Sequence, residues 1–375
     1  MRVVHLIKVV GVAGAEQHLL TLLPGLRQMG IDAQIRLLVR PDRLMVDYVN
    51  ALKERGVPAE TVVIRGHADV TLVPRLRKLF SEVRADIVHT HLIHADLYGG
   101  LAARWAGVPI VVSSKHNDDA FRYRKAVRML NRMLWGQTNA GIAISDAIGR
   151  FSIEVEGAKP QQVHQIHYGL DTRTRPLDRG RAHSTLRAEV GIAGDAPVVG
   201  MVCRLIEQKG VVYGLRAFAQ VAEAFPTAHL VIAGDGGLRG ALEAEAKQAG
   251  LSERVHFLGW RGDIPALMAG LDILLAPSLW EGFGLVLLEA MAQQTAIIGS
   301  RVSAIPEVVR EAETGLLVPP RDVDGLAEAL RQLLGDAPLR QHMGLMGRDR
   351  LEEHFSATKM VQETAALYHT LVDGV

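Results

Sequence analysis

Short apolar runs alternate with helical patterns from the start of the chain, and this order restricts the fold more than any other feature. Strand-like runs occupy residues 3–10, 35–39, 61–64, 87–90, 110–113 and 140–145. Helical periodicity occupies residues 15–29, 72–83 and 97–106 between them. Strands joined by helices predict a parallel sheet, because parallel strands need long crossover connections. The fold class is therefore α/β, with ligands expected at the carboxyl ends of the strands.

The second half of the chain repeats this alternation after a break. The stretch YGLDTRTRPLDRGR, residues 168–181, has no apolar periodicity and marks a domain boundary. Strand-like runs follow at residues 198–203, 230–233, 255–258, 273–276 and 296–299, and residues 356–375 have a helical pattern. A chain of 375 residues, 48% of them hydrophobic, is long enough for two domains with separate cores. We therefore expect domains at residues 1–171 and 172–355.

Charge balance and cysteine count exclude several classes of function. Lysine and arginine number 42 against 41 for aspartate and glutamate, so no overall positive field points to nucleic acid. The single cysteine, Cys203, excludes an internal disulfide framework, fits a reducing cytosol and is expected to be a small core residue. The N-terminal segment MRVVHLIKVVG is too short and too polar for a signal peptide or a membrane span. A cytoplasmic chain without a transmembrane helix is expected.

Residues 276–294, APSLWEGFGLVLLEAMAQQ, form the most informative local stretch. A turn-forming piece leads into an apolar run, so a helix is expected to start at Gly284 or Leu285. The first backbone N–H groups of such a helix have no partner within it and make the preceding loop an anion site. Gly282 and Gly284 flank Phe283, which lets the backbone lie close against a ligand. A phosphate fits this arrangement.

Two glutamates belong to the same stretch. Glu281 precedes the expected helix, and Glu289 lies about one turn into it among leucine, alanine and methionine. A buried acid needs hydrogen-bond donors, and sugar or ribose hydroxyls supply them. Both carboxylates can therefore border one pocket. Taken alone, the two glutamates support two simpler interpretations as well as they support a pocket. Glu281 would only make a favourable contact with the helix dipole, and Glu289 would lie on a solvated stripe.

Two cations follow the expected strand at residues 198–203. Arg204 and Lys209 stand before a helix that starts near residue 211. Such a pair can clamp a diphosphate, with arginine as a fork and lysine as a point charge. The same cations would stabilise negative charge on a leaving diphosphate, which a metal ion does in other enzymes. No DxD motif is placed to bind a metal, so no metal and no cofactor are expected.

The segment 120–137, AFRYRKAVRMLNRMLWGQ, predicts a basic amphipathic helix. Its cations are Arg122, Arg124, Lys125, Arg128 and Arg132. This pattern is typical of a helix that seeks phosphate or an anionic membrane surface. A helix packed on its own domain with a solvated basic face gives the same pattern, so both interpretations stay open.

Histidines gather at the ends of two expected strands. His89, His91 and His94 resemble a metal cluster, but His89 and His91 are expected on opposite faces of the strand, so no metal site is predicted. His116 stands among Lys115, an asparagine and an aspartate after the strand at 110–113. It is expected to face a ligand cleft; the alternative is a histidine in a surface loop.

The spacing E-G-F-G-L-V-L-L-E, with seven residues between the glutamates, resembles the signature of retaining glycosyltransferases of family 4, also called glycosyl transferases group 1. The upstream motif R-L-x-x-x-K-G resembles the diphosphate signature of the same family. The resemblance covers nearly the whole chain. It implies a GT-B fold, in which two Rossmann-like domains face a cleft. It also implies transfer of a sugar from a nucleoside-diphosphate sugar to a hydroxyl acceptor.

The resemblance further implies roles for individual residues. Arg204 and Lys209 would hold the diphosphate, and Glu289 would accept hydrogen bonds from the ribose. The donor sugar would be held by Glu281 and by the backbone from Gly282 through Phe283 and Gly284 to Leu285. His116 would lie beside the reacting centre.

In the first domain, Gly14 falls in a turn that resembles the family's G-G-A-E, with alanine in place of the first glycine. The segment YGLD departs from the family's N-G-V-D, and the tail 356–375 would cross back onto the first domain.

Several alternatives remain open at this point. A sugar-nucleotide epimerase or hydrolase shares this fold, and a non-catalytic protein that binds nucleotide sugars fits the altered YGLD turn. The expected acceptor is a lipid-linked or cell-surface glycan, which would place the chain at the inner face of the cell membrane. The nucleotide and the sugar are left open.

Overall fold

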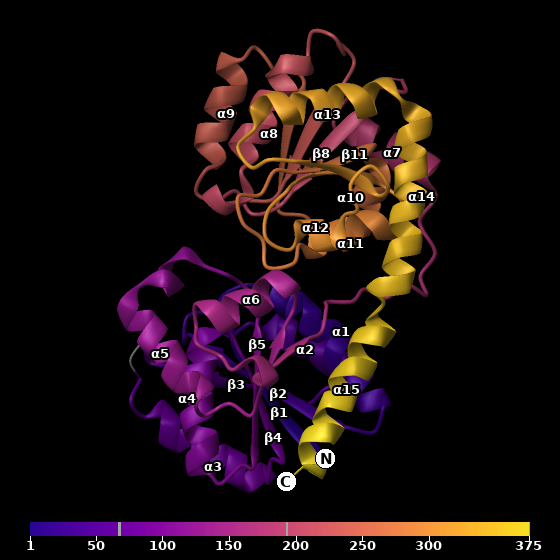
Figure 1. Ribbon diagram of the computed structural model, residues 1–375. Coiled ribbons are helices and arrows are strands. Elements are labelled where there is room, and N and C mark those ends of the chain that lie inside the picture. The colour runs from indigo at the N-terminus through magenta and orange to yellow at the C-terminus, as the bar shows by residue number, and fades with distance from the viewer. Residues whose placement is uncertain (67–68, 193, 375) are drawn as a thin grey trace. The chain divides into compact units, whose positions relative to one another are not determined.

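The chain divides into two compact units (Figure 1). The computed structural model describes residues 1–66, 69–192 and 194–374. Unit 1 comprises Met1–Asp171 together with Ala357–Val375, and unit 2 comprises Thr172–Ser356. Each unit is built around its own parallel sheet, which confirms the predicted α/β class.

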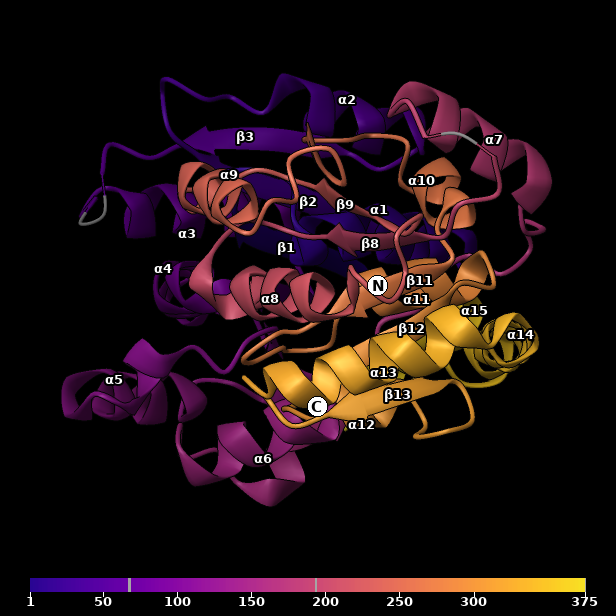
Figure 2. The same ribbon diagram turned by 90° about the horizontal axis from the view of Figure 1, so that it is seen from above.

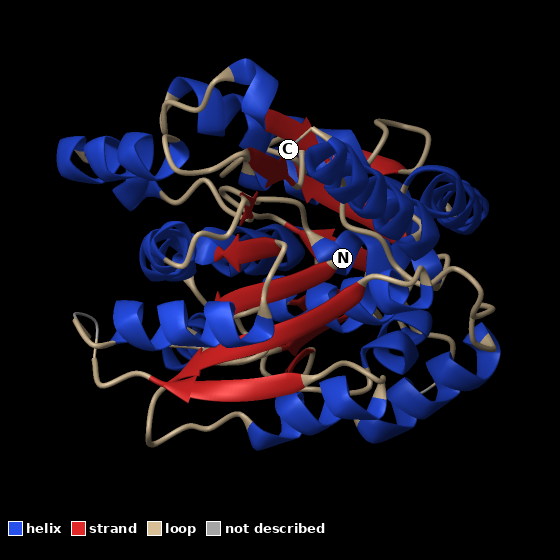
Figure 3. Ribbon diagram, turned by 90° about the horizontal axis from the view of Figure 1, so that it is seen from below, coloured by secondary structure: helices blue, strands red, loops and turns tan. Residues whose placement is uncertain are grey.

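Unit 1 contains a seven-stranded sheet in the order β3-β2-β1-β4-β5-β6-β7, whose strands lie side by side in Figure 3. The strands are β1 (Arg2–Lys8), β2 (Asp32–Val39), β3 (Ala59–Val63), β4 (Ile87–His91), β5 (Ile110–Lys115), β6 (Ala140–Ala143) and β7 (Val163–Gln165). The helices are α1 (Gly14–Gln28), α2 (Val46–Glu54), α3 (Leu72–Val83), α4 (Leu92–Trp105), α5 (Lys125–Trp135), α6 (Asp146–Glu154) and α15 (Ala357–Asp373). The strand order reverses between β1 and β4, which is where such sheets bind ligands.

Alternate residues of the strands of unit 1 feed two separate cores. Ile87 of β4 packs with Leu19 of α1 and Tyr368 of α15, whereas Val88 packs with residues of α3. The helix α15 is thus part of the core of unit 1. It lies close against α1, because a Cβ atom at Gly25 would come within 2.5 Å of Val361.

The predicted continuous helix at residues 120–137 is wrong. A short 3₁₀ helix, Ala120–Tyr123, is followed by Arg124 in extended conformation, and only then does α5 begin. The reason is Arg122, which is buried and forms an ion pair with Glu156. Asn131 and Trp135 also donate to Glu156, at 3.3 and 3.2 Å. Arg122 therefore belongs to the interior and not to the basic surface.

Unit 2 contains a six-stranded sheet in the order β10-β9-β8-β11-β12-β13, most of which is visible in Figure 2. The strands are β8 (Val198–Val202), β9 (His229–Ala233), β10 (Val255–Gly259), β11 (Ile273–Ala276), β12 (Ala296–Ser300) and β13 (Gly315–Val318). The helices are α7 (Arg179–Glu189), α8 (Val211–Val221), α9 (Arg239–Gln248), α10 (Ile264–Gly270), α11 (Leu285–Ala292), α12 (Ile305–Val308), α13 (Val323–Gly335) and α14 (Ala337–His354). The order reverses between β8 and β11, so a ligand site is expected at their carboxyl ends.

Two further observations concern the predicted domain boundary and the question of a membrane span. The aperiodic stretch 168–181 includes the start of α7, which is capped by Asp178 accepting a bond from the backbone N–H of Arg181 at 3.1 Å. None of the helices in the described residues is both long enough and apolar enough to cross a membrane.

Candidate functional site

Two loops close against each other at the carboxyl ends of β8 and β11. The backbone N–H of Leu279 donates to the carbonyl of Gln208 at 2.7 Å, and the side chain of Gln208 donates to the carbonyl of Trp280 at 3.2 Å. Gly210 has a positive φ of 58°, and a Cβ atom there would lie 2.0 Å from the carbonyl oxygen of Pro277. The glycine of the R-L-x-x-x-K-G motif is therefore required for the loops to meet.

The loop after β9 fixes the backbone around Arg204. The N–H of Cys203 donates to Ala233 at 3.0 Å, and the N–H of Leu205 donates to Asp235 at 2.9 Å. The side chain of Arg204 is exposed. Within the described residues, the structure records no ion pair for this guanidinium. A fixed backbone with an exposed cation is suited to an anionic ligand.

Lys209 and Glu281 form an ion pair between the two loops. Their side chains are only 15% and 11% exposed, and the hydroxyl of Ser278 lies 3.3 Å from Oε2 of Glu281. Lys209, Glu281, Ser278 and Cys203 line a small pocket. Burial raises the pKa of the Cys203 thiol to about 11, so this thiol stays protonated and is not a nucleophile at neutral pH.

The helix α11 begins at the same pocket. Gly284 caps it in the left-handed conformation with φ 88°, and the helix starts at Leu285, as predicted. Val286 and Leu287 line the pocket, so the first turn of α11 faces it. The positive end of the helix dipole adds positive potential beside Lys209.

The side chain of Phe283 does not take part in this pocket. It is 1% exposed and packs edge-on against Phe355, with ring centroids 5.7 Å apart. Only the backbone of the Gly282 to Gly284 loop is therefore available to a ligand. Phe283 anchors this loop in the core of unit 2.

Glu289 lies on α11 outside the group of residues that line the pocket. Burial among apolar neighbours raises the pKa of its carboxyl to about 7. No described residue is recorded as its hydrogen-bond or ion-pair partner. A carboxyl in this state can both accept and donate hydrogen bonds near neutral pH.

The other two predicted residues, Gly14 and His116, belong to unit 1. Gly14 is the first residue of α1, and a Cβ atom there would meet nothing within 4 Å. Local packing therefore does not require this glycine. One turn later, the ring of His18 stacks on Tyr168 at 4.3 Å and lies 6.2 Å from the ring of His116.

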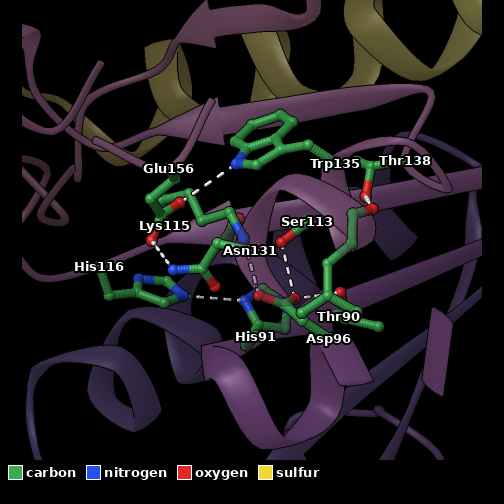
Figure 4. A network of polar contacts seen from close by, with 12 residues as sticks. Thr90, His91, Asp96, Ser113, Lys115, His116, Asn131, Trp135, Thr138 and Glu156 are labelled. Atoms are coloured by element: carbon green, nitrogen blue, oxygen red, sulfur yellow. Dashed lines mark hydrogen bonds and ion pairs between the residues drawn. The ribbon is translucent and has the colours of Figure 1, made fainter. Parts of the chain in front are cut away.

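His116 is buried, so the alternative of a surface histidine is wrong. Its Nδ1 lies 2.5 Å from the hydroxyl of Tyr168. Its Nε2 lies 3.1 Å from Nδ1 of His91, a contact drawn in Figure 4. Burial, with the positive charges of Lys115 and Arg122, lowers the pKa of His116 to about 3. The ring is therefore neutral at physiological pH.

The reason given for excluding a metal at His89 and His91 is also wrong. Residues two apart on a strand share a face. Both rings lie with His5 of β1, and one nitrogen from each of the three falls within 4.8 Å of the others, a grouping that could hold a metal ion. His94 lies on α4, with its ring 4.7 Å from that of Tyr98. That His5 joins His89 and His91 in this group could have been predicted from the adjacency of β1 and β4.

Comparisons with known proteins agree with this geometry. A model of the family described as Glycosyl transferases group 1 matches residues 183–350, and a model of Glycosyltransferase Family 4 matches residues 12–174. Alpha-maltose-1-phosphate synthase of Mycolicibacterium smegmatis is 30% identical over 309 residues, which cover 76% of this chain and 79% of the relative. The chain belongs to the glycosyl transferases group 1 family. It is therefore a glycosyltransferase.

A second relative of this glycosyltransferase aligns over more of the chain. The UDP-Gal:alpha-D-GlcNAc-diphosphoundecaprenol alpha-1,3-galactosyltransferase of Escherichia coli is 29% identical, covering 90% of this chain and 89% of the relative. HepE from Anabaena, solved with UDP and glucose, has a TM-score of 0.88 at 22% identity over 99% of this chain and 100% of HepE. Sucrose-phosphate synthase from Thermosynechococcus elongatus has a TM-score of 0.85 at 21% identity over 100% of both chains. The glycosyltransferase has the GT-B fold.

Proposed function

We propose that this glycosyltransferase moves a sugar from a nucleoside-diphosphate sugar to a hydroxyl acceptor with retention of anomeric configuration. The observation that carries the proposal is the ion pair of Lys209 and Glu281 in the pocket beside the first turn of α11, with Arg204 exposed next to the pocket residue Cys203. The exposed guanidinium, the ammonium and the positive end of the helix dipole together match a diphosphate. HepE, solved with UDP and glucose, and the Escherichia coli relative, whose name includes UDP-Gal, support this ligand class.

The roles follow from the charges. Arg204 binds the diphosphate as a fork, and Lys209 turns from Glu281 toward a phosphate oxygen when the donor enters. Glu281 then accepts a hydrogen bond from a hydroxyl of the donor sugar. Glu289 binds the ribose hydroxyls, and His116 lies beside the reacting sugar. The two cations stabilise the diphosphate as it leaves, so the transfer needs no metal ion or other cofactor.

Thermal stability in the presence of nucleotides tests the donor site. UDP, GDP, ADP and their sugar conjugates are added in turn to the full chain, because a ligand of the folded state raises the melting temperature. One nucleotide should raise it, and Arg204→Ala and Lys209→Ala should abolish the shift. Arg216→Ala, which removes an outward-facing pair with Glu245, is the matched control and should keep it. Equal shifts in all four proteins would remove these cations from the site.

Product analysis separates the proposed reaction from its rivals. With donor and a hydroxyl acceptor, a retaining transferase forms one glycoside whose anomeric proton has the same configuration as in the donor, as measured by NMR. Consumption of donor without acceptor would indicate an epimerase or hydrolase. Nucleotide binding with no turnover against any acceptor, and with no effect of Glu281→Ala, would indicate a non-catalytic binding protein.

We also propose that the acceptor is a lipid-linked or cell-surface glycan and that α5 docks on an anionic membrane. On α5, Met129 and Met133 are 75% and 48% exposed beside Lys125, Arg128 and Arg132. Exposed methionines with flanking cations fit the boundary between lipid headgroups and acyl chains. The diphosphoundecaprenol in the name of the Escherichia coli relative supports a lipid-linked acceptor.

Vesicle binding tests the membrane proposal. The triple variant Arg124→Gln, Lys125→Gln, Arg128→Gln should lose binding to vesicles that contain phosphatidylglycerol. The control triple variant neutralises Lys53, Lys78 and Arg331, which are exposed elsewhere, and should still bind. If both triple variants bind as the unchanged chain does, α5 is only a solvated basic helix.

A further inference from the structure

Seven side chains of unit 1 form a continuous series of hydrogen bonds, here called the histidine chain. In order, its contacts are Ser114 Oγ to His89 Nε2 at 2.8 Å, His89 Nδ1 to Tyr368 OH at 2.5 Å, Tyr368 OH to His5 Nε2 at 3.4 Å, His5 Nδ1 to His91 Nε2 at 3.0 Å, His91 Nδ1 to His116 Nε2 at 3.1 Å and His116 Nδ1 to Tyr168 OH at 2.5 Å. Figure 4 shows the contact between His91 and His116. The series joins β1, β4, β5 and α15 to the segments after β5 and β7.

Strand register explains why these residues meet. His5 of β1 is paired with His89 of β4, and His91 is paired with Ser114 of β5. Paired and alternate residues share one face of a parallel sheet, and Tyr368 covers that face from α15. Each of the four strand side chains is at most 2% exposed.

Each neutral histidine carries one ring hydrogen, so the direction of one hydrogen bond in the series fixes the direction of the next. A neutral ring has one N–H donor and one acceptor nitrogen, and a hydroxyl can fill both roles. If His116 donates from Nε2, His91 must accept at Nδ1 and donate from Nε2, and the same constraint passes to His5. Burial lowers the pKa of each of these histidines far below its usual value, so the rings are neutral at pH 7.

Only two arrangements of His5, His91 and His116 satisfy the contacts between these three rings. In one arrangement, all three carry hydrogen on Nε2, and Tyr168 donates to His116. In the other, all three carry it on Nδ1, and His116 donates to Tyr168. Mixed tautomers among these three rings would leave two donors or two acceptors facing each other inside the core, which costs more than a lost hydrogen bond.

We propose that His5, His91 and His116 are polarised as a unit, and that Tyr368 and Tyr168, which flank these three rings, are positioning residues that set the tautomer of His116. The helix α15 thereby controls which nitrogen of His116 carries the hydrogen. The effect on catalysis rests on the proposed function, which places His116 beside the donor sugar. The coupling of tautomers does not rest on it.

Removing the hydroxyl of Tyr368 and removing that of Tyr168 should push the tautomers in opposite directions. In Tyr368→Phe, Nε2 of His5 has no acceptor, and a buried N–H without a partner is disfavoured more than a bare lone pair. His5, His91 and His116 should then all carry hydrogen on Nδ1. In Tyr168→Phe, Nδ1 of His116 has no acceptor, so the same three rings should carry hydrogen on Nε2.

The test is long-range ¹H–¹⁵N correlation NMR on the full chain with labelled histidine, at pH 7.5 and without substrate. The unchanged protein should show one tautomer for His5, His91 and His116. At least one of the two tyrosine variants must change the tautomer of the remote histidine: His116 in Tyr368→Phe, or His5 in Tyr168→Phe. Thr364→Val is the matched control, because it removes another buried hydroxyl from α15 and should change none of them.

Three results would overturn the proposal. The first is a mixture of tautomers among His5, His91 and His116 in the unchanged protein, and the second is no remote change in either tyrosine variant. The third is a shift of the His5, His89 and His91 signals on adding stoichiometric Zn²⁺, which would make the same rings a metal site. The first of these results is measured on the unchanged protein. The proposal can therefore still be refuted if a variant fails to fold.

Kinetics then connects the histidine chain to transfer. We expect Tyr368→Phe to lower kcat about tenfold and to leave KM for the donor unchanged, since α15 belongs to unit 1. Coupled tautomers in a protein that binds no nucleotide would refute only the proposed function. Normal transfer with uncoupled tautomers would refute only this inference.

Discussion

The two units share one strand order at their centres but fill the ends of those strands in opposite ways. In unit 1, Asp96 accepts hydrogen bonds from Thr90 and Ser113, at 2.6 Å each, and from Lys115 at 2.7 Å (Figure 4). The side chains of Lys115 and Asp96 are only 6% and 4% exposed. In unit 2, Glu281 pairs with Lys209. Among the described residues, its only other recorded side-chain partner is Ser278. The first carboxylate is saturated by protein, and the second has lone pairs left for a ligand.

This contrast separates stability from binding. A saturated buried pair holds elements together, and its loss leaves an uncompensated charge. A pair that lines a pocket can exchange one partner for a ligand of the same charge, so that neither side chain is left unpaired. We therefore expect unit 1 to respond to substitution mainly in stability and unit 2 mainly in binding.

The largest expected effect is on the saturated pair. Asp96→Ala should lower the free energy of unfolding of unit 1 by about 3–5 kcal/mol, because it leaves the Lys115 ammonium buried without its carboxylate. Urea denaturation followed by circular dichroism measures this loss. Glu281→Ala, the comparison in unit 2, should lose less than half as much. Equal losses would mean that exposure does not distinguish the two pairs.

Acid should also destabilise unit 1. His5 and His116 have their pKa lowered by burial to about 3, whereas an unfolded histidine titrates near 6.5. Between these values the unfolded chain binds more protons, so stability is full above pH 6.5 and falls as the pH drops. At pH 5 each of the two histidines should have lost about 2 kcal/mol of its contribution. Replacing His5 with glutamine should flatten this pH dependence, as measured by unfolding at pH 7 and pH 5.

Neutralising Lys209 tests the contrast between the two units on the side of unit 2. Lys209→Gln should weaken nucleotide binding about 10-fold to 100-fold, because a charge-assisted bond to phosphate is lost. Its free energy of unfolding should fall by less than that of Asp96→Ala, because this pair is more exposed than Lys115 and Asp96. Calorimetric titration and urea denaturation give the two values, with Lys247→Gln on the exposed face of α9 as the control. A large loss of stability would show that the pair is structural.

The smallest expected effect compares two glycines at helix starts. Gly284→Ala should destabilise unit 2 by about 1–2 kcal/mol, since an alanine at φ 88° is strained and its Cβ would lie 2.9 Å from Leu287. Gly14→Ala should leave the stability of unit 1 unchanged or slightly raised, because nothing lies near its Cβ. Thermal unfolding of both variants measures this. A destabilised Gly14→Ala protein would contradict the open space at that turn.

The parts of this molecule that follow from local spacing could be predicted from the sequence. The parallel sheets follow from the alternation of apolar runs, and the start of α11 follows from the glycines before it. The proximity of Lys209 to Glu281 was implied by the family spacing, and the ion pair is consistent with it. The roles of Arg204, Glu289, Gly14 and His116 stay predictions.

The parts that depend on distant segments could not be predicted in this way. Arg122 was assigned to a basic surface because its partner, Glu156, lies beyond α5. Tyr368 could not be linked to His89 before α15 was placed on the sheet. The assignment of His89 and His91 to opposite faces was an error of strand periodicity, which the sequence alone could have corrected. The packing of the Phe283 ring against Phe355 could not be predicted from the motif, and the assignment of its backbone to the donor sugar stays a prediction.

The return of α15 to unit 1 has a consequence for synthesis on the ribosome. Unit 2 is one continuous segment, so all of it has been made before α15 leaves the exit tunnel. Unit 1 begins first but must wait with the apolar surface that Met360, Val361 and Tyr368 later cover. The second unit can therefore finish folding before the first. A nascent chain stalled near residue 356 would present that uncovered surface, and the unfinished histidine chain, to molecular chaperones.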